Sequence, residues 1–418
     1  MKFMKRTKSA IFSFLILCLA MTQLLGQKKD SLDIKIGQMI LIGVPGTTVD
    51  TLVLREIREG KAGSIILFEK NIASKNSYAQ LKKMIWTYNM VAPIPLFVSI
   101  DQEGGRVNRL KEKYGFPKSL SAANMSASID SVRYYGQTTA ATLSGLGFNV
   151  NFAPVVDLAT NPDNPVIAKV ERSFSADPDT VALYSREFVK THRQLGVITV
   201  LKHFPGHGSS KDDTHLGIAD VSNTWERKEL KPYQLLIDAG YVDAIMTAHI
   251  VNRKLDTKEL PGTLSSRILD SLLRKSLHFD GVVFSDDMQM HAITKHYGLE
   301  EAIKLAVNAG VDILTFSNNI QGSEDRTVDK VHAIIRNFVE DGSIPKARID
   351  ESFERIMRLK RRLGPAEREF YQKELARTQK ELALANQKIK AQDSLLAKQK
   401  KSAELEEEKK VKRKKKKN

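Results

Sequence analysis

The chain has 418 residues, of which 42% are hydrophobic and 27% charged, a composition that indicates a folded globular protein and excludes a largely disordered one. Its formal net charge of +16 would suggest a nucleic-acid-binding protein, but the excess charge is concentrated at the two ends of the chain. Residues 1–29 hold an excess of six positive charges and residues 366–418 an excess of eight, which leaves +2 for residues 30–365. The central part is therefore nearly neutral, and we do not expect it to bind nucleic acid.

Residues 1–27 have the pattern of a secretory signal peptide, with a basic start followed by the apolar run 11–19. The run is short for a transmembrane helix, so we predict an exported protein, periplasmic or secreted, with an uncleaved membrane anchor as the alternative. The only cysteine, Cys18, lies inside this run. It follows Leu17, where a lipoprotein signal needs a small residue. After cleavage the chain would contain no cysteine, and hence neither disulfides nor thiolate metal sites.

From about residue 36 to residue 360, short apolar runs alternate with amphipathic helical stretches. This alternation predicts a parallel sheet covered by helices. Eight such units favour a closed (β/α)8 barrel of the TIM type. A doubly wound open sheet is the alternative, which the lack of a Gly-rich phosphate loop after the first strand disfavours. The predicted strands are 36–42, 64–68, 96–100, 148–153, 197–202, 244–249, 282–285 and 313–316, and the predicted helices are 52–59, 78–88, 131–144, 180–195, 226–239, 266–277 and 300–309.

Residues 366–418 contain no glycine or proline and are rich in Ala, Glu, Lys, Gln and Leu. Apolar residues recur there every seven positions, which predicts a long helix that could associate weakly with another helix. The basic end 412–417 is most simply a solvated tail, with contact to an acidic surface as the alternative. We therefore divide the chain into a signal peptide (1–27), a barrel domain (31–362) and a charged helical tail (366–418). The heptad positions are Leu375, Leu382, Ile389 and Leu396.

Charged and ionisable residues stand at the end of five of the eight predicted strands or in the loop that follows. Asp213 and His215 stand two apart in the loop after strand 197–202, close enough for a carboxylate to orient an imidazole. In an α/β barrel the carboxyl ends of the strands face one mouth, where the chemistry takes place. The pattern therefore favours an active site over a network of structural ion pairs. The other strand-end groups are the segments 101–109, 171–174 and 285–288 and the residues Lys202, His203 and His249.

Other kinds of site are weakly supported. His203, His207, His215, His249 and Asp286 could supply metal ligands, but none has a tight ligand spacing such as H-x-x-x-H. No serine stands in the context of a nucleophile elbow. We predict neither a metal nor a cofactor, and we interpret His207 and His249 as structural.

Four motifs occur in a defined order, DQEGGRVNR, ERSF, KHFPGHG with a following D-x-H, and FSDDM. Together they resemble glycoside hydrolase family 3, on its β-N-acetylglucosaminidase (NagZ-like) branch. The resemblance covers about residues 31–362. It implies a (β/α)8 barrel that acts on carbohydrate.

The resemblance also implies roles for individual residues. Asp286 matches the nucleophile, His215 the general acid/base, and Asp213 the partner that orients it. An alternative use of the cationic members of the site is ion pairing with Asp101 or Asp157. The residues that match those gripping the N-acetylglucosamine unit are Asp101, Arg109, Arg172, Lys202 and His203.

The chemistry of these residue types agrees with the implied roles. A retaining glycosidase needs a nucleophile and an acid/base about 5 Å apart, and a histidine has a pKa near the working pH without further tuning. Asp287 is the rival of Asp286. Because successive strand residues point to opposite faces, we expect only one of the two to enter the mouth, and the family pattern selects Asp286. Nucleophilic attack by the substrate's own acetamido group is a further variant, from which the His/Asp pair points away.

We predict a retaining, exo-acting β-N-acetylglucosaminidase for peptidoglycan- or chitin-type fragments. The alternatives within the family are a β-glucosidase or xylosidase, whose second domain this chain has no room for, and a phosphorylase that uses phosphate in place of water. The alternative of another class is a non-catalytic cell-wall-binding protein held by its basic tail.

Overall fold

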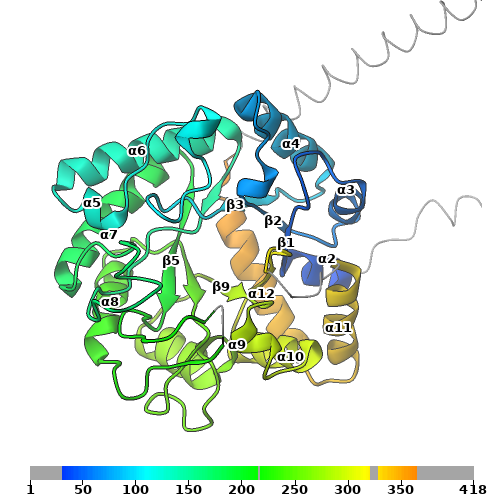
Figure 1. Cartoon of the computed structure of the whole chain (residues 1–418). Helices are drawn as coiled ribbons and strands as arrows, with labels where there is room; N and C mark the ends of the chain where they lie inside the picture. The colour runs from blue at the N-terminus through cyan, green and yellow to red at the C-terminus, as the bar shows by residue number, and fades with distance from the viewer. Residues whose placement is uncertain (1–30, 215–216, 321–327, 365–418) are drawn as a thin grey trace, which may run out of the picture. The chain divides into compact units, whose positions relative to one another are not determined.

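Eight parallel strands close into a barrel in the computed structural model, which describes residues 31–214, 217–320 and 328–364. The strand order is β1-β10-β9-β7-β5-β4-β3-β2, and the helices surround the strands (Figure 1). The (β/α)8 prediction is confirmed. The open-sheet alternative is wrong, because β1 pairs with β2 on one side and with β10 on the other, which leaves no edge between them. The barrel strands are β1 (Ile40–Gly43), β2 (Ser64–Leu67), β3 (Phe97–Ile100), β4 (Val150–Asn151), β5 (Ile198–Phe204), β7 (Ala244–Thr247), β9 (Val282–Asp287) and β10 (Ile313–Phe316), while β6 (Ala219–Asp220) and β8 (Ile250–Val251) form a separate pair.

Several strand boundaries differ from the prediction; β4 and β7, for example, are shorter than the predicted strands 148–153 and 244–249. Residues 36–38 belong to α2 (Ser31–Gln38), and β1 begins only at Ile40. A short apolar run fits a buried helix face as well as a strand, so hydrophobic pattern alone does not separate the two. In contrast, β5 and β9 run further than predicted, to Phe204 and Asp287. Both strands therefore hold polar residues of the predicted site within the sheet itself.

The helices begin and end where their sequences provide caps. The carboxylates of Asp50 and Asp177 accept hydrogen bonds from the first turns of α3 and α7. Gly196 and Gly240, which follow the ends of α7 and α8, both have a φ of 72°, which favours glycine. The helices are α3 (Thr51–Arg58), α4 (Ser77–Val91), α5 (Ala122–Met125), α6 (Ile129–Leu146), α7 (Pro178–Gln194), α8 (Lys231–Asp238), α9 (His291–Thr294), α10 (Leu299–Ala309), α11 (Val328–Glu340) and α12 (Lys346–Lys360), with a π-helix at Arg267–Ser276 and 3₁₀ turns at Glu69–Asn71, Glu112–Tyr114, Arg227–Leu230 and Gly262–Leu264.

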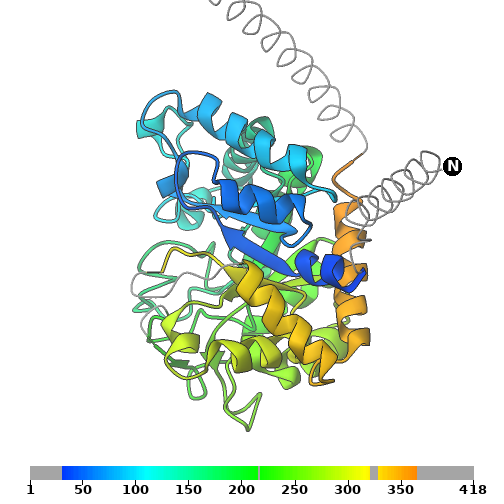
Figure 2. The same cartoon turned by 90° about the vertical axis from the view of Figure 1, so that its right-hand side faces the viewer.

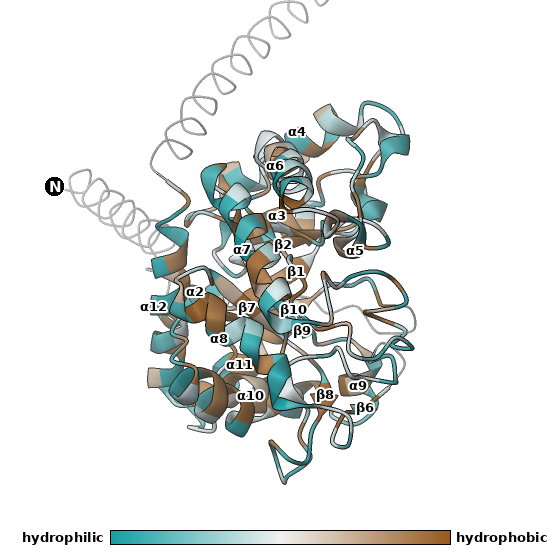
Figure 3. Ribbon diagram, turned by 90° about the vertical axis from the view of Figure 1, so that its left-hand side faces the viewer, coloured by the Kyte–Doolittle hydropathy of each residue, from teal (hydrophilic) through white to brown (hydrophobic). Residues whose placement is uncertain are grey.

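The barrel interior is packed with apolar side chains. Most barrel strands are buried along their whole length, as expected for parallel strands covered by helices. Figure 3 shows hydrophobic residues along the strands and on the inward faces of the helices. Inside the barrel, the ring of Phe284 lies 5.4 Å from that of Phe152 and 6.3 Å from that of Phe97. The barrel is thus a filled core, and a ligand has room only at its ends.

No helix within the three described ranges is long and apolar enough to cross a bilayer. The predicted signal peptide (1–27) and the predicted helical tail (366–418) lie outside the described residues.

A buried lysine lies at the end of the barrel where α2 and α12 lie side by side (Figure 2). Lys360, on α12, donates from Nζ to Gln38 Oε1 at 2.6 Å and to the Gly63 carbonyl oxygen at 2.8 Å. The ammonium also lies 4.8 Å from the centre of the Phe97 ring. Its partners are all uncharged, and burial lowers the pKa of Lys360 to about 7.

We expect Lys360→Met to change how stability depends on pH. The folded wild type binds the proton of Lys360 only below about pH 7, whereas the unfolded chain keeps it up to the ordinary pKa of 10.5. Wild-type stability should therefore rise between pH 6 and pH 9, and the free energy of unfolding of the variant relative to wild type should fall by about 2–3 kcal/mol over that interval. Urea unfolding of both proteins at the two pH values measures this difference. A difference independent of pH would contradict the burial argument.

Candidate active site

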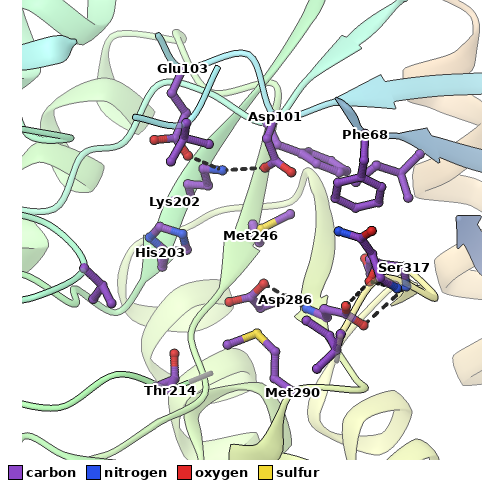
Figure 4. A pocket seen from close by; sticks show the side chains of 18 of the residues that line it. Phe68, Asp101, Glu103, Lys202, His203, Thr214, Met246, Asp286, Met290 and Ser317 are labelled. Carbon is purple, nitrogen blue, oxygen red and sulfur yellow. Dashed lines mark hydrogen bonds and ion pairs between the residues drawn. The ribbon is translucent and has the colours of Figure 1, made fainter. Parts of the chain in front are cut away.

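A pocket of about 280 Å³ opens at the carboxyl ends of the barrel strands. Figure 4 shows side chains from several strands converging on it. Barrels of this type hold their chemistry at this end, and the volume suits a small ligand. Six of the eight predicted site residues line the pocket, namely Asp101, Arg109, Arg172, Lys202, His203 and Asp286.

The remaining two predicted residues belong to the loop after β5. Asp213 is half-buried, next to Thr214, which is buried and lines the pocket. His215 lies outside the described residues.

One wall of the pocket is a chain of alternating charges (Figure 4). The Lys202 side chain is only 2% exposed. Its Nζ lies 2.8 Å from Asp101 Oδ1 and 2.7 Å from Glu103 Oε1. Arg172 binds the same Glu103 carboxylate with two parallel bonds, Nε to Oε2 at 2.7 Å and Nη2 to Oε1 at 2.8 Å. A charge removed from water this far must be paired. The predicted pairing of Lys202 with Asp101 is present, whereas Arg172 pairs with Glu103.

The cations keep both carboxylates ionised. Burial alone would raise the pKa of Asp101, but the charges of Lys202 and Arg109 outweigh burial and lower it. Burial opposes ionisation of Glu103 as well, and there the charges of Arg172 and Lys202 hold the pKa well below its usual range. These two carboxylates therefore present fixed negative charges to the pocket rather than groups that titrate near neutral pH.

Arg109 forms the rim beside this wall. Its Nη2 lies 3.4 Å from Asp101 Oδ2, and its guanidinium lies 5.5 Å from the centre of the Phe68 ring. The ring and the carboxylate hold the guanidinium from two sides, so that it is oriented before a ligand arrives.

His203 is fixed by a buried carboxylate. Its Nδ1 lies 2.7 Å from Asp157 Oδ2, and its Nε2 lies 3.3 Å from Nη2 of Arg172. A guanidinium can only donate, so these partners favour the tautomer with the proton on Nδ1. Lys202 and His203 both line the pocket, and the peptide bond between them is cis.

The two adjacent aspartates of β9 have different surroundings. Both line the pocket, so the expectation that only one would reach the mouth is wrong. The Asp287 carboxylate, however, accepts hydrogen bonds from the Gln289 N–H at 3.0 Å, the Ser317 N–H at 3.3 Å and the Ser317 hydroxyl. It thereby ties β9 to the loop after β10. Asp286 instead accepts the Asp287 N–H at 2.8 Å, which orients its carboxylate within the pocket.

Burial raises the pKa of Asp287 to about 6, with Asp286 contributing in the same direction. The hydrogen bonds that Asp287 accepts oppose this shift without cancelling it. Its environment is therefore that of a buried structural carboxyl.

Apolar side chains line the same pocket, among them Phe152, Met246 and Met290. A lining with both charged and apolar groups suits a ligand with both hydroxyl groups and C–H faces, as a sugar ring has.

The histidines predicted as structural have buried partners. His207 Nε2 lies 3.4 Å from Thr214 Oγ1, and burial lowers the pKa of His207 to about 4. His249 is fully buried, with Nδ1 2.7 Å from Thr263 Oγ1 and Nε2 2.9 Å from the Asp287 carbonyl oxygen. His249 thus supports the end of β9, and His207 contributes to the pocket lining as well.

Two residues of the site received no role in the sequence-based prediction. Glu103 stands inside the DQEGGRVNR motif, so its position was noted but its function as the shared partner of Lys202 and Arg172 was not. Asp157 was considered only as an ion-pair partner of the cations, whereas it binds His203. The motif alone could have marked Glu103. Nothing in the local sequence marks Asp157.

Among residues 31–214, 217–320 and 328–364, no group of three or more His, Cys, Asp or Glu side chains is arranged to hold a metal ion.

Residues 31–359 match the family model described as the glycosyl hydrolase family 3 N-terminal domain. The chain belongs to glycosyl hydrolase family 3. The family predicted from the four motifs is thus confirmed.

Several members of the family resemble the chain over most of the barrel. The β-hexosaminidases of Xanthomonas campestris pv. campestris and Tolumonas auensis are each 34% identical to it, over 66% and 68% of this chain and 83% and 84% of their own. A solved family 3 β-N-acetylglucosaminidase from a Paenibacillus species is 34% identical with a TM-score of 0.72, over 80% of this chain but only 62% of that one. A β-N-acetylhexosaminidase from Beutenbergia cavernae is 28% identical with a TM-score of 0.70, over 79% of this chain and 98% of its own.

We expect Glu103→Gln to destabilise the fold as well as the pocket. The change leaves two buried cations short of one carboxylate, which should lower the free energy of unfolding by about 3 kcal/mol at pH 7. Because the native pKa of Glu103 is depressed below its ordinary 4.5, the stability it provides is present above that value and is lost as the pH falls. The deficit of the variant should therefore shrink between pH 6 and pH 3. Urea unfolding measures it, with the exposed Glu354→Gln on α12 as the matched control, and an equal effect of both substitutions would contradict the pairing argument.

Proposed function

We propose that the chain is a retaining, exo-acting β-N-acetylglucosaminidase that removes a terminal β-linked N-acetylglucosamine from peptidoglycan- or chitin-type fragments. The observation that carries the proposal is the position of Asp286, oriented in a pocket that is lined both by a wall of paired charges and by apolar side chains. The names of the family members that resemble the chain support the same activity and sugar. The small pocket supports exo action, since it favours a chain end over the middle of a polymer.

In the first step, Asp286 attacks the anomeric carbon of the sugar. A bond forms between the carboxylate oxygen and this carbon, and the bond from the carbon to the leaving oxygen breaks. The Asp287 N–H orients the nucleophile, and the hydrogen bonds that Asp287 accepts from the neighbouring loop keep it from competing. In the second step, water attacks the same carbon and releases the sugar with retained configuration.

We assign proton transfer to His215, with Asp213 as its partner. The imidazolium gives its proton to the leaving oxygen in the first step and the imidazole takes one from water in the second. The assignment is supported by the motif and by Thr214, which directly precedes His215 and lines the pocket. A carboxylate partner favours the imidazolium form that the first step needs.

The wall residues bind and orient the sugar in this proposal. Asp101 offers acceptors, and Lys202, Arg109 and Arg172 offer donors, to hydroxyl groups and to the acetamido carbonyl. His203 holds the Arg172 guanidinium in place through its Nε2. Because these groups already hold one another in place, little side-chain entropy is lost when the sugar binds.

Export of the protein is part of the same proposal. The basic start and apolar run of residues 1–27 support passage to the periplasm or beyond, where wall fragments occur. The basic tail supports weak contact with an acidic surface or another helix.

We expect the wild type to release free N-acetylglucosamine from a nitrophenyl β-N-acetylglucosaminide, at a rate independent of added phosphate. Asp286→Ala should lower kcat by about 10⁴-fold or more, because no other group can form the glycosyl-enzyme. Product analysis with and without phosphate measures the reaction, and mass spectrometry after a fluorinated substrate analogue locates the adduct. An adduct on Asp287 would refute the assignment, and a sugar phosphate as the product would show a phosphorylase. A wild type with no turnover would favour a wall-binding protein.

His215→Ala should affect substrates according to their leaving group. For a disaccharide, whose leaving oxygen needs a proton, kcat/KM should fall by about 10²–10⁴-fold. For the nitrophenyl substrate, which needs little protonation, we expect kcat/KM within about tenfold of wild type. Steady-state kinetics on both substrates provides the comparison. Equal losses on the two would exclude the acid role.

A further inference from the structure

The turn after β5 is held by three buried side chains. Residues 206–210 form this turn and lead to Thr214 at the pocket. Asp157 accepts the His207 N–H at 2.7 Å, and the Asn164 amide donates to two carbonyl oxygens of the turn at 2.8 and 3.0 Å. Asp157 and Asn164 both come from the segment after β4, so they hold the turn from the side that precedes it in sequence.

The third side chain, Glu229, reaches the turn from the other side in sequence. It lies in the 3₁₀ turn Arg227–Leu230, and its Oε2 accepts the Gly208 N–H at 3.0 Å. Packing is tight, since a Cβ on Gly206 would stand 2.7 Å from the Glu229 Cβ. The bond joins residues 21 positions apart. It thereby closes the base of the segment that contains Thr214.

A carboxyl group is an unusual choice for this position. Glu229 is only 1% exposed, and its carboxyl interacts with the Gly208 N–H and with the neighbouring Ser209 hydroxyl. Burial, reinforced by Asp157, raises the pKa of Glu229 to about 7, while the neighbouring Ser209 hydroxyl and Gly208 N–H oppose the shift. Burying a carboxyl group costs free energy even where it is hydrogen-bonded. Filling the space does not require a carboxyl, whereas holding the Gly208 N–H requires an acceptor at this position.

We propose that Glu229 is a positioning residue for the glycosidase reaction, because its bond to Gly208 sets where Thr214 meets the pocket. The inference rests on the proposed function, since it assigns Glu229 to the delivery of the acid/base that directly follows Thr214 in the sequence. A displacement of about 1 Å at a reacting group can lower a rate by about 10²-fold. The hydrogen bond of Glu229 is to the turn and not to a residue proposed to grip the sugar, so its loss should weaken proton transfer more than sugar binding.

The test compares Glu229→Ala, Glu229→Asp and Glu229→Gln with Glu226→Ala, an exposed glutamate three residues earlier. Ala removes the acceptor, and Asp keeps the charge but withdraws it from Gly208 by one methylene. Gln keeps both the length and the oxygen, and it resembles the protonated carboxyl. We expect Ala and Asp to lower kcat/KM for a disaccharide by about 10–100-fold but for a nitrophenyl glycoside by less than about threefold. Gln and the Glu226 control should stay within about threefold of wild type on both.

A purely structural role would reduce folded protein and so lower both rates equally, and that outcome would overturn the proposal. Should the Ala variant not fold, the Asp variant decides by the same ratio of the two rates. If Glu229→Gln is impaired as much as Glu229→Asp, the charge of the side chain matters rather than its hydrogen bond to Gly208. That result would also overturn the proposal. A wild type inactive on both substrates would instead refute the proposed function.

Discussion

The pocket depends on one buried ammonium group. Lys202 is almost fully enclosed, and two carboxylates must accompany it because an unpaired charge at this depth is too costly. One of them, Glu103, is shared with Arg172, so a single network joins the loop after β3, strand β5 and the loop after β4. These three segments are far apart in sequence. Their side chains therefore become a rigid wall only in the closed barrel, and the wall is oriented before a sugar arrives.

Much of the fold was predictable, because the buried strands of a parallel barrel occur in the sequence as apolar runs at regular spacing. The start of the strand predicted at 36–42 was wrong, because an apolar stretch shorter than two helical turns fits a helix as well as a strand. Six site residues were predictable because each stands at a strand end or in a motif. The supporting residues Asp157 and Glu229 were not, since their roles come from partners 46 and 21 positions away. Such roles depend on burial and distance, which local sequence does not encode.

The adjacent aspartates show how environment divides chemistry between identical groups. Strand alternation alone would have turned one of them away from the mouth, yet both line it. What separates them is their partners, because Asp287 holds the neighbouring loop while its backbone N–H orients Asp286. Asp287 thus acts on the Asp286 carboxylate through its backbone N–H, while its own carboxyl holds the loop. The pair works as one unit, so a change at Asp287 should not be read as a test of the nucleophile.

The balance of charge in the pocket also bears on what can bind there. The cations Arg109, Arg172 and Lys202 are each engaged by a carboxylate of the same wall, so their charge is largely compensated. An anion entering the pocket would meet these carboxylates together with Asp286. A neutral ligand with many hydroxyl groups instead gains hydrogen bonds to side chains that are already fixed in place. Because such a ligand carries no charge, the pairing of the cations with carboxylates weakens its binding little. The wall is therefore suited to a neutral sugar, and this compensation argues for water rather than phosphate as the second reactant.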